Sequence, residues 1–118
     1  MAKRYGLSRD ERLRRRREFD RVFAEGARRR GPLLTVRCLA NGLPRRRLGI
    51  AVGRGWRTAV TRNRAKRLIR EAFRTHKHEL PKGVDVVVVP RPRWQEPTVE
   101  ALAAELVRLA HRAAEEAR

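Results

Sequence analysis

One short segment limits the possible folds of this chain more than any other, because residues 84–89 read Val-Asp-Val-Val-Val-Val. Branched side chains of this kind favour extended backbone. An apolar run without polar alternation is typical of a strand that is covered on both faces, as in parallel sheets. Pro81 and Gly83 precede the run, and Pro90 and Pro92 follow it. We therefore expect an interior strand of a sheet with protein layers on both sides.

The longest helical pattern begins at Thr61, a plausible N-cap residue. Its apolar positions follow the spacing i, i+3, i+4, i+7, i+8 of one buried helix face; they are Ala65, Leu68, Ile69, Ala72 and Phe73. The opposite face is polar and strongly basic, with Arg62, Asn63, Lys66, Arg67, Arg70 and Arg74. This pattern predicts a helix that packs on the sheet and presents cations to solvent.

Two further helices are expected. Within residues 15–25, Phe19, Val22 and Phe23 recur at i, i+3 and i+4, which is an amphipathic helical face. A last helix begins near Thr98 and has one apolar side, formed by Val99, Leu102, Leu106, Leu109 and Ala113. We expect its acidic residues on the solvent face; they are Glu100, Glu105, Glu115 and Glu116.

The segment between the first two helices is predicted to be extended. In residues 33–40, every second side chain is small or apolar, namely Leu34, Val36, Cys38 and Ala40, and these alternate with Leu33, Thr35, Arg37 and Leu39. Such alternation is typical of a half-buried strand. Residues 47–52 form the next strand, and the turn at Asn41-Gly42 predicts that the two pair as a hairpin. Residues 56–60 are either a short strand or an extended loop.

The order helix, strands, helix, strand, helix indicates an α+β or α/β sandwich with one sheet. We see no internal repeat and no linker, so residues 15–118 are expected to form a single domain. Residues 1–14 are expected to be a flexible basic arm, although Ser8 and Glu11 have the spacing of a capping box.

The charge of the chain points to a polyanionic partner. The 118 residues include 31 Lys and Arg against 13 Asp and Glu, a net charge of +18. Residues 45–77 carry 12 basic side chains and one acidic one, and residues 1–30 carry 12 and five, whereas residues 78–118 are nearly neutral. Such asymmetry indicates a directed binding face. Most of the cations are arginines, which favours nucleic acid over a lipid surface.

The composition also excludes several classes of protein. Cys38 is the single cysteine, so neither an intrachain disulfide nor a Cys-based metal site can form, and no disulfide-linked partner is expected. The apolar runs are far shorter than the roughly 20 residues that span a bilayer, so we expect no membrane partner. No Ser–His–Asp set or close carboxylate pair suggests catalysis by protein side chains. We expect a protein of the cytoplasm.

Residues 62–71 carry the most specific motif. They read Arg-Asn-Arg-x-Lys-Arg-x-x-Arg-Glu, are preceded by Ala59-Val60, and closely resemble the signature of the bacterial ribonuclease P protein subunit. Segments in residues 17–26, 47–52 and 85–91 resemble other parts of that family in the same order. The resemblance covers about residues 12–112, nearly the whole chain.

This resemblance implies a four-stranded sheet and three helices in the order αβββαβα, with a left-handed crossover where right-handed ones are the rule. It also implies a division of labour, in which a large RNA carries the metal ions and cleaves precursor tRNA. The protein would dock on this catalytic RNA and hold the single-stranded 5′ leader in a cleft. Mg²⁺ is accordingly expected at the RNA active site, and none on the protein alone.

The resemblance assigns residues to both contacts by their positions in the family motifs, and it assigns none to catalysis. Those expected to face the catalytic RNA are Arg62, Asn63, Arg64, Lys66, Arg67 and Arg70. Those expected to line the leader cleft are Phe19, Phe23, Arg37 and Arg54. The loop at residues 53–58 departs from the family, because Gly55 and Trp56 replace a basic and a small hydrophobic residue. Arg37 lies where an aromatic residue is common, so a guanidinium contact would replace stacking.

Three other functions remain open at this point. A ribosomal or other structural RNA-binding protein of similar fold would explain the charge but not the ordered motifs. A protein-only nuclease would need carboxylates in the basic region, and residues 26–70 contain none. A DNA-binding module is the third. The roles of three aromatic residues also stay open: Phe19 and Phe23 could stack on bases or pack in the core, and Trp56 could do either.

Overall fold

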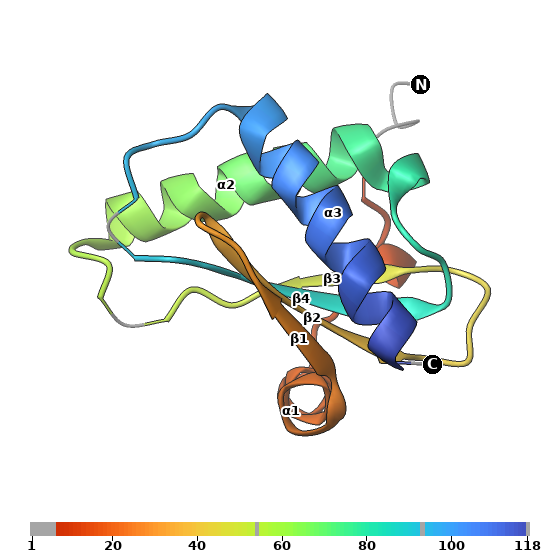
Figure 1. The fold of residues 1–118 in the computed structure, drawn as a ribbon. Coiled ribbons are helices and arrows are strands. Elements are labelled where there is room, and N and C mark those ends of the chain that lie inside the picture. The colour runs from red at the N-terminus through yellow and green to blue at the C-terminus, as the bar shows by residue number, and fades with distance from the viewer. Residues whose placement is uncertain (1–6, 54, 93, 118) are drawn as a thin grey trace.

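The computed structural model describes residues 7–53, 55–92 and 94–117. Its main elements are α1 (Arg16–Glu25), β1 (Ala27–Arg30), β2 (Leu34–Ala40), β3 (Arg47–Ile50), α2 (Ala59–His76), β4 (Val84–Pro90) and α3 (Val99–Ala117). Short 3₁₀ turns occur at η1 (Arg9–Glu11) and η2 (Lys77–Glu79). Helices α2 and α3 cover one face of the sheet and α1 lies on the other (Figure 1). The expected α+β class with three helices and one four-stranded sheet is confirmed.

The interior strand is confirmed as well. The sheet has the order β1-β2-β4-β3, so β4 lies between β2 and β3. It pairs antiparallel with β2 and parallel with β3. All residues of β4 are buried except Val89, which is partly covered. The apolar pattern of this strand, which only Asp85 interrupts, is therefore explained by helices on both faces and strands on both edges. The left-handed crossover stays a prediction.

The predicted hairpin of residues 33–40 with residues 47–52 is wrong. Strand β3 pairs with β4, with Leu48 opposite Val86, and β4 separates it from β2. The residues just before β4 enter between the two: Asn41 N–H donates to Gly83 O at 3.0 Å, and Gly83 N–H donates to Arg45 O at 3.2 Å. Pairing with the more apolar strand buries more surface than a direct hairpin would, so β4 displaces it.

Two element boundaries also differ from the prediction. The sequence patterns predicted two strands before α2, at residues 33–40 and 47–52, and the structure adds β1 in front of them. The sequence of β1, Ala-Arg-Arg-Arg, has no apolar alternation, and the strand pairs with β2. Residues 56–60 hold no strand: helix α2 already begins at Ala59, with Thr58 rather than Thr61 as its N-cap. Thr61 N–H donates to Thr58 Oγ1 at 3.1 Å. Both threonines suit a cap, and the loop geometry selects the first.

The two faces of the sheet hold cores of unequal size. The larger core lies under α2 and α3 and includes Leu34, Val36, Cys38, Leu48, Ile69, Phe73, Val84, Val86, Val88, Leu102, Leu106 and Leu109. The smaller core lies under α1 and consists of Leu13, Val22 and Val87, with Phe19, Leu39, Ala51 and Val89 packed against it. Since one short helix covers this second face, much of it remains for other contacts.

Residues 7–14 differ from the flexible arm that the sequence suggested. Leu13 is only 6% exposed, and its N–H donates to Leu48 O at 2.8 Å along the outer edge of β3. The Lys77 ammonium lies 3.1 Å from a Glu11 carboxylate oxygen, which ties η1 to the end of α2. The apolar Leu13 and this ion pair hold the segment in place. Residues 1–6 of the expected arm lie outside the described residues.

We expected Glu105 on the solvent face of α3, and this prediction is wrong. Its side chain is buried, with the residue only 6% exposed. Its Oε2 accepts the backbone N–H groups of Leu33 at 2.8 Å and Leu34 at 2.7 Å, where the β1–β2 connection enters β2. A buried amide without a partner is costly, so this carboxylate allows the turn to lie against α3.

Replacing Glu105 by Leu should lower the free energy of unfolding by about 2–3 kcal/mol, because one buried and one partly buried N–H group lose their acceptor. Glu105→Gln keeps an acceptor oxygen and should cost less. Urea unfolding followed by circular dichroism measures both. A Leu variant as stable as the parent chain would show that these bonds contribute nothing.

A polar network ties α1 to the sheet. Asp85 is 5% exposed and accepts two hydrogen bonds from Arg47, each 2.8 Å long. Arg47 also donates to Glu18 at 3.3 Å. Glu18 in turn accepts the N–H groups of Arg14 and of the N-cap residue Arg15, which lie just before α1. These N–H groups, together with Arg47, lower the pKa of Glu18 although burial opposes the shift.

This lowered pKa predicts how stability depends on pH. The carboxylate has an ordinary pKa of 4.5 and a lower one when folded, so its contribution is complete above about pH 4.5. That contribution is lost as the pH falls through the folded value. Glu18→Gln keeps the hydrogen-bonding shape but removes the titration, so unfolding free energy should fall less steeply below pH 4.5. Glu115→Gln, on the exposed side of α3, is the matched control and should leave the slope unchanged.

Candidate nucleic-acid interface

Helix α2 carries all six residues that were expected to face a catalytic RNA. Five of them are exposed, namely Arg62, Asn63, Arg64, Arg67 and Arg70, and Lys66 is half-buried. The other face is buried through Ala65, Ile69, Ala72 and Phe73. The helical period thus separates a core face from a basic face, as the sequence predicted. Salt-dependent binding to phosphates is what such a face can do chemically.

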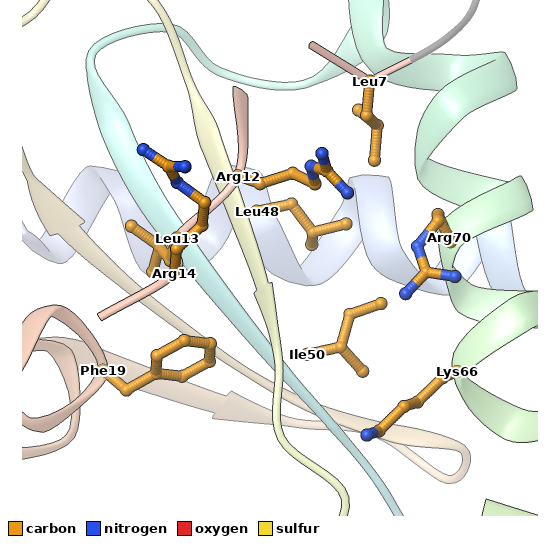
Figure 2. A pocket seen from close by; sticks show the side chains of 9 residues that line it. All are labelled: Leu7, Arg12, Leu13, Arg14, Phe19, Leu48, Ile50, Lys66 and Arg70. Atoms are coloured by element: carbon orange, nitrogen blue, oxygen red, sulfur yellow. The ribbon is translucent and has the colours of Figure 1, made fainter. Parts of the chain in front are cut away.

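The structure divides these cations between two flanks of α2. On one flank, Lys66 and Arg70 line a cavity of about 280 Å³ together with β3 and residues 7–14 (Figure 2). On the other flank, Arg64 and Arg67 line a groove of about 440 Å³ that reaches Val99 at the start of α3, and Arg70 lies between the two hollows and lines both. The basic face is therefore broader than a single ridge, and it has two hollows.

Arg64 already has a carboxylate partner. Its guanidinium makes a two-pronged ion pair with Glu96, with one hydrogen bond of 2.8 Å from Nη2 and a shorter one from Nε. This contact raises the pKa of Arg64 and lowers the pKa of Glu96. An RNA phosphate that bound Arg64 would have to replace Glu96, so this arginine has a competing partner.

Trp56, whose role the sequence left open, packs against Trp94. The two rings meet edge to face with their centroids 5.4 Å apart. The contact joins the loop before α2 to the connection before α3, next to the ion pair of Arg64 and Glu96. Trp56 therefore packs against a neighbouring ring beside the first turns of α2.

On the α1 side of the sheet, the structure brings two of the expected leader residues together. Phe23 is 39% exposed, and the guanidinium carbon of Arg37 lies 5.0 Å from its ring centroid, a cation–π distance. Arg28 lies opposite Arg37 in the β1–β2 register. Burial lowers the pKa of Arg37, and the charge of Arg28 lowers it further. An exposed ring can stack on a base, and the neighbouring guanidinium groups can attract a phosphate.

Phe19 lies in a different environment, although it is on the same helix. It is half-buried and packs against the core of Leu13, Val22 and Val87. Its ring also crosses β3 so closely that a Cβ on Gly49 would come within 2.6 Å of it. The two interpretations left open by the sequence thus separate: Phe19 packs mainly inward and Phe23 outward. Arg54, the fourth expected leader residue, lies outside the described residues.

Several cations of these surfaces were not among the expected site residues. Arg12 and Arg14 line the same cavity as Lys66 and Arg70, and Arg28 stands beside Arg37. The sequence Ala-Arg-Arg-Arg of β1 has no apolar alternation that could have assigned Arg28 to a face, and only the pairing with β2 places it opposite Arg37. Nothing in the sequence pattern showed that residues 12–14 run along β3.

Two negative findings apply to the part of the chain that the structure describes. Within residues 7–53, 55–92 and 94–117, no group of three or more His, Cys, Asp or Glu side chains is placed to hold a metal ion. None of the helices in these ranges has the length and apolar character needed to cross a membrane.

A sheet with one half-open basic face, together with a basic helix backed by core, defines an α+β protein that binds nucleic acid. The family described as Ribonuclease P matches residues 7–114 of the sequence. The chain belongs to the ribonuclease P protein family.

Relatives of known name agree with this assignment. The ribonuclease P protein component of Thermotoga maritima is 45% identical over 90 residues, which are 76% of this chain and 77% of that protein. That of Desulfovibrio desulfuricans is 40% identical over 116 residues, covering 95% and 89%. The relatives support a ribonuclease P protein and not the ribosomal alternative.

Solved structures show the same fold. The ribonuclease P protein of Thermotoga maritima superposes with a TM-score of 0.77 at 38% identity, covering 86% of this chain and 96% of that one. The ribonuclease P protein of Staphylococcus aureus gives a TM-score of 0.74 at 28% identity, covering 87% and 94%.

The contrast between the two phenylalanines makes a testable prediction. Phe23→Ala should weaken binding of a single-stranded RNA oligonucleotide by about 1–3 kcal/mol, the usual loss of one base stack, with little change in stability. Phe19→Ala should instead lower the free energy of unfolding. Fluorescence anisotropy and thermal unfolding measure the two effects. Equal RNA affinity of Phe23→Ala and the parent chain would contradict a stacking role.

Proposed function

We propose that this protein acts as the protein component of a ribonuclease P ribonucleoprotein whose RNA carries out the cleavage of precursor tRNA. The observation that carries the proposal is the basic face of α2, backed by buried Ala65, Ile69 and Phe73, in a chain of this family. A rigid row of cations on a helix can neutralise several phosphates at once, which supplies most of the affinity for a folded RNA.

The two basic surfaces would serve different RNAs. Helix α2 would dock on the catalytic RNA, and the surface of Phe23 and Arg37 would take the single-stranded 5′ leader of precursor tRNA. Their separation supports this division, since α2 and α1 lie on opposite faces of the sheet (Figure 1). Stacking tolerates any base, as a protein that serves many tRNA precursors would need.

The protein would assist the reaction by binding and by electrostatic screening. Its cations reduce repulsion between the catalytic RNA and the substrate, two polyanions that must approach each other. Mg²⁺ bound by the RNA would supply the metal chemistry of cleavage, and this chain would lower the Mg²⁺ concentration at which the two RNAs associate. The same proposal places the protein with its RNA substrates in the cytoplasm.

Reconstitution with the cognate catalytic RNA and a precursor tRNA tests the function. Leader removal should depend strongly on the protein at low Mg²⁺ and weakly at high Mg²⁺, because metal ions then replace its screening. Gel analysis of cleavage rates over an Mg²⁺ series measures this. Equal rates with and without the protein at low Mg²⁺ would refute the proposal.

The role of α2 has its own test. A protein with both Arg62→Ala and Arg67→Ala loses two exposed cations. The negative slope of log K against log salt for catalytic RNA should therefore become shallower by roughly two. Filter binding at several salt concentrations measures the slope. Arg112→Ala removes one exposed cation from α3, and its slope should match that of the parent chain. An unchanged slope in the double variant would remove α2 from the interface.

A further inference from the structure

The cavity beside α2 joins three of the expected contact residues, Phe19, Lys66 and Arg70, to residues that belong to neither expected contact. It is bounded by the segment at residues 7–14, by the outer edge of β3 and by α2, and Phe19 closes one end (Figure 2). The lining residues are Leu7, Arg12, Leu13, Arg14, Phe19, Leu48, Ile50, Lys66 and Arg70. Four of these nine carry a positive charge and none carries a negative one, so the cavity is complementary to an anion.

The apolar and charged side chains occupy different parts of the cavity. Figure 2 shows Leu48 and Ile50 in the middle, with Arg12, Arg70 and Lys66 around them. Its volume of about 280 Å³ lies near the lower limit of roughly 300–1,000 Å³ for small-ligand pockets. The space suits one small ligand that has a flat apolar part and an anionic part, and it is too small for a helix.

The edge of β3 adds hydrogen-bonding groups. Ala51 N–H donates to Val88 O of β4 at 3.0 Å, whereas Leu48 O faces outward and accepts Leu13 N–H. Successive residues of a parallel strand direct their N–H and C=O to opposite sides, so Ile50, two residues after Leu48 and one before Ala51, has the outward orientation of Leu48. No backbone partner for Ile50 on this side is found among the described residues. Its amide and carbonyl can therefore pair with the edge of a base.

We propose that this cavity binds a single unpaired nucleotide of the catalytic RNA. The base would lie on Leu48 and Ile50, with its edge toward the backbone of Ile50, and the phosphate would lie between Lys66 and Arg70. Arg12 would make a further phosphate contact. The proposal rests on the proposed function, because it names the contact that α2 makes with its RNA.

The catalytic RNA is favoured over the leader as the source of this nucleotide. Lys66 and Arg70 belong to the helix whose exposed face also carries Arg62 and Arg67, so an RNA lying along α2 reaches the cavity without leaving the helix. The leader surface is centred on Phe23 and Arg37, which do not line the cavity. The segment at residues 7–14 thereby becomes part of the RNA contact.

The two isoleucines of the chain provide a direct test. Ile50 lines the cavity and Ile69 is buried in the main core, so a protein labelled at isoleucine δ1 methyl groups gives one signal for each. Titration with adenosine 5′-monophosphate should shift the Ile50 signal and leave that of Ile69 unchanged. Adenosine lacks the phosphate and inorganic phosphate lacks the base. Each should therefore bind at least ten-fold more weakly than adenosine 5′-monophosphate.

Charge variants then test the phosphate contact. Lys66→Gln and Arg70→Gln should each weaken mononucleotide binding by about ten-fold, since each removes a charge-assisted hydrogen bond. Arg67→Gln is the matched control, because it removes the same charge from the same helix outside this cavity. Its affinity should stay within two-fold of the parent chain. Equal losses in all three variants would show a diffuse charge effect and overturn the site.

Two further arms identify the RNA and separate this proposal from the function. Catalytic RNA should shift Ile50, and a single-stranded leader oligonucleotide should not; the reverse result would overturn the assignment to catalytic RNA. Absence of any Ile50 shift with adenosine 5′-monophosphate, or equal binding of inorganic phosphate, would refute the nucleotide pocket. If the reconstituted enzyme still removes leaders, the pocket fails and the proposed function stands. A shifted Ile50 without leader removal would refute the function alone.

Discussion

The burial of β4 on both faces is the constraint on which the rest of the structure depends. A strand of valines lowers its free energy only when each face is covered and both edges are paired. Helices α2 and α3 cover one face with a large core, and α1 covers part of the other. The same demand draws β3 away from β2 and into parallel pairing with β4. The turn at Asn41-Gly42 predicted a hairpin of β2 with β3, but β3 buries more apolar surface when it pairs with β4.

The unequal cover of the sheet also decides where RNA can bind. Because α1 is short, Phe23 and Arg37 remain near the surface of its face, whereas Phe19 fills the space against Gly49. The ion pairs that join Asp85, Arg47 and Glu18 hold α1 in this place. Stability and binding are therefore coupled, since the contacts that orient α1 also set how far the exposed ring stands from the sheet.

The sequence predicted some parts of the candidate site better than others. The faces of α2 follow from local spacing, so the basic residues from Arg62 to Arg70 and the core residues opposite them could be assigned without a structure. The ion pair of Arg64 with Glu96 joins residues 32 positions apart. The cavity joins Arg12 to Lys66 and Arg70 across β3. Neither pairing has a local pattern, so neither could be predicted.

What the sequence determined by itself is the type of each strong element and the face that it buries. Those properties depend on side-chain spacing along a helix or strand, which is local. The tertiary structure alone decided the strand order, the burial of Glu105, the course of residues 7–14 and the distribution of α2 cations between two hollows. These depend on which distant surfaces bury the most apolar area and satisfy the most buried N–H groups together. These contacts join residues that are far apart in the sequence, so they are defined only in the folded protein.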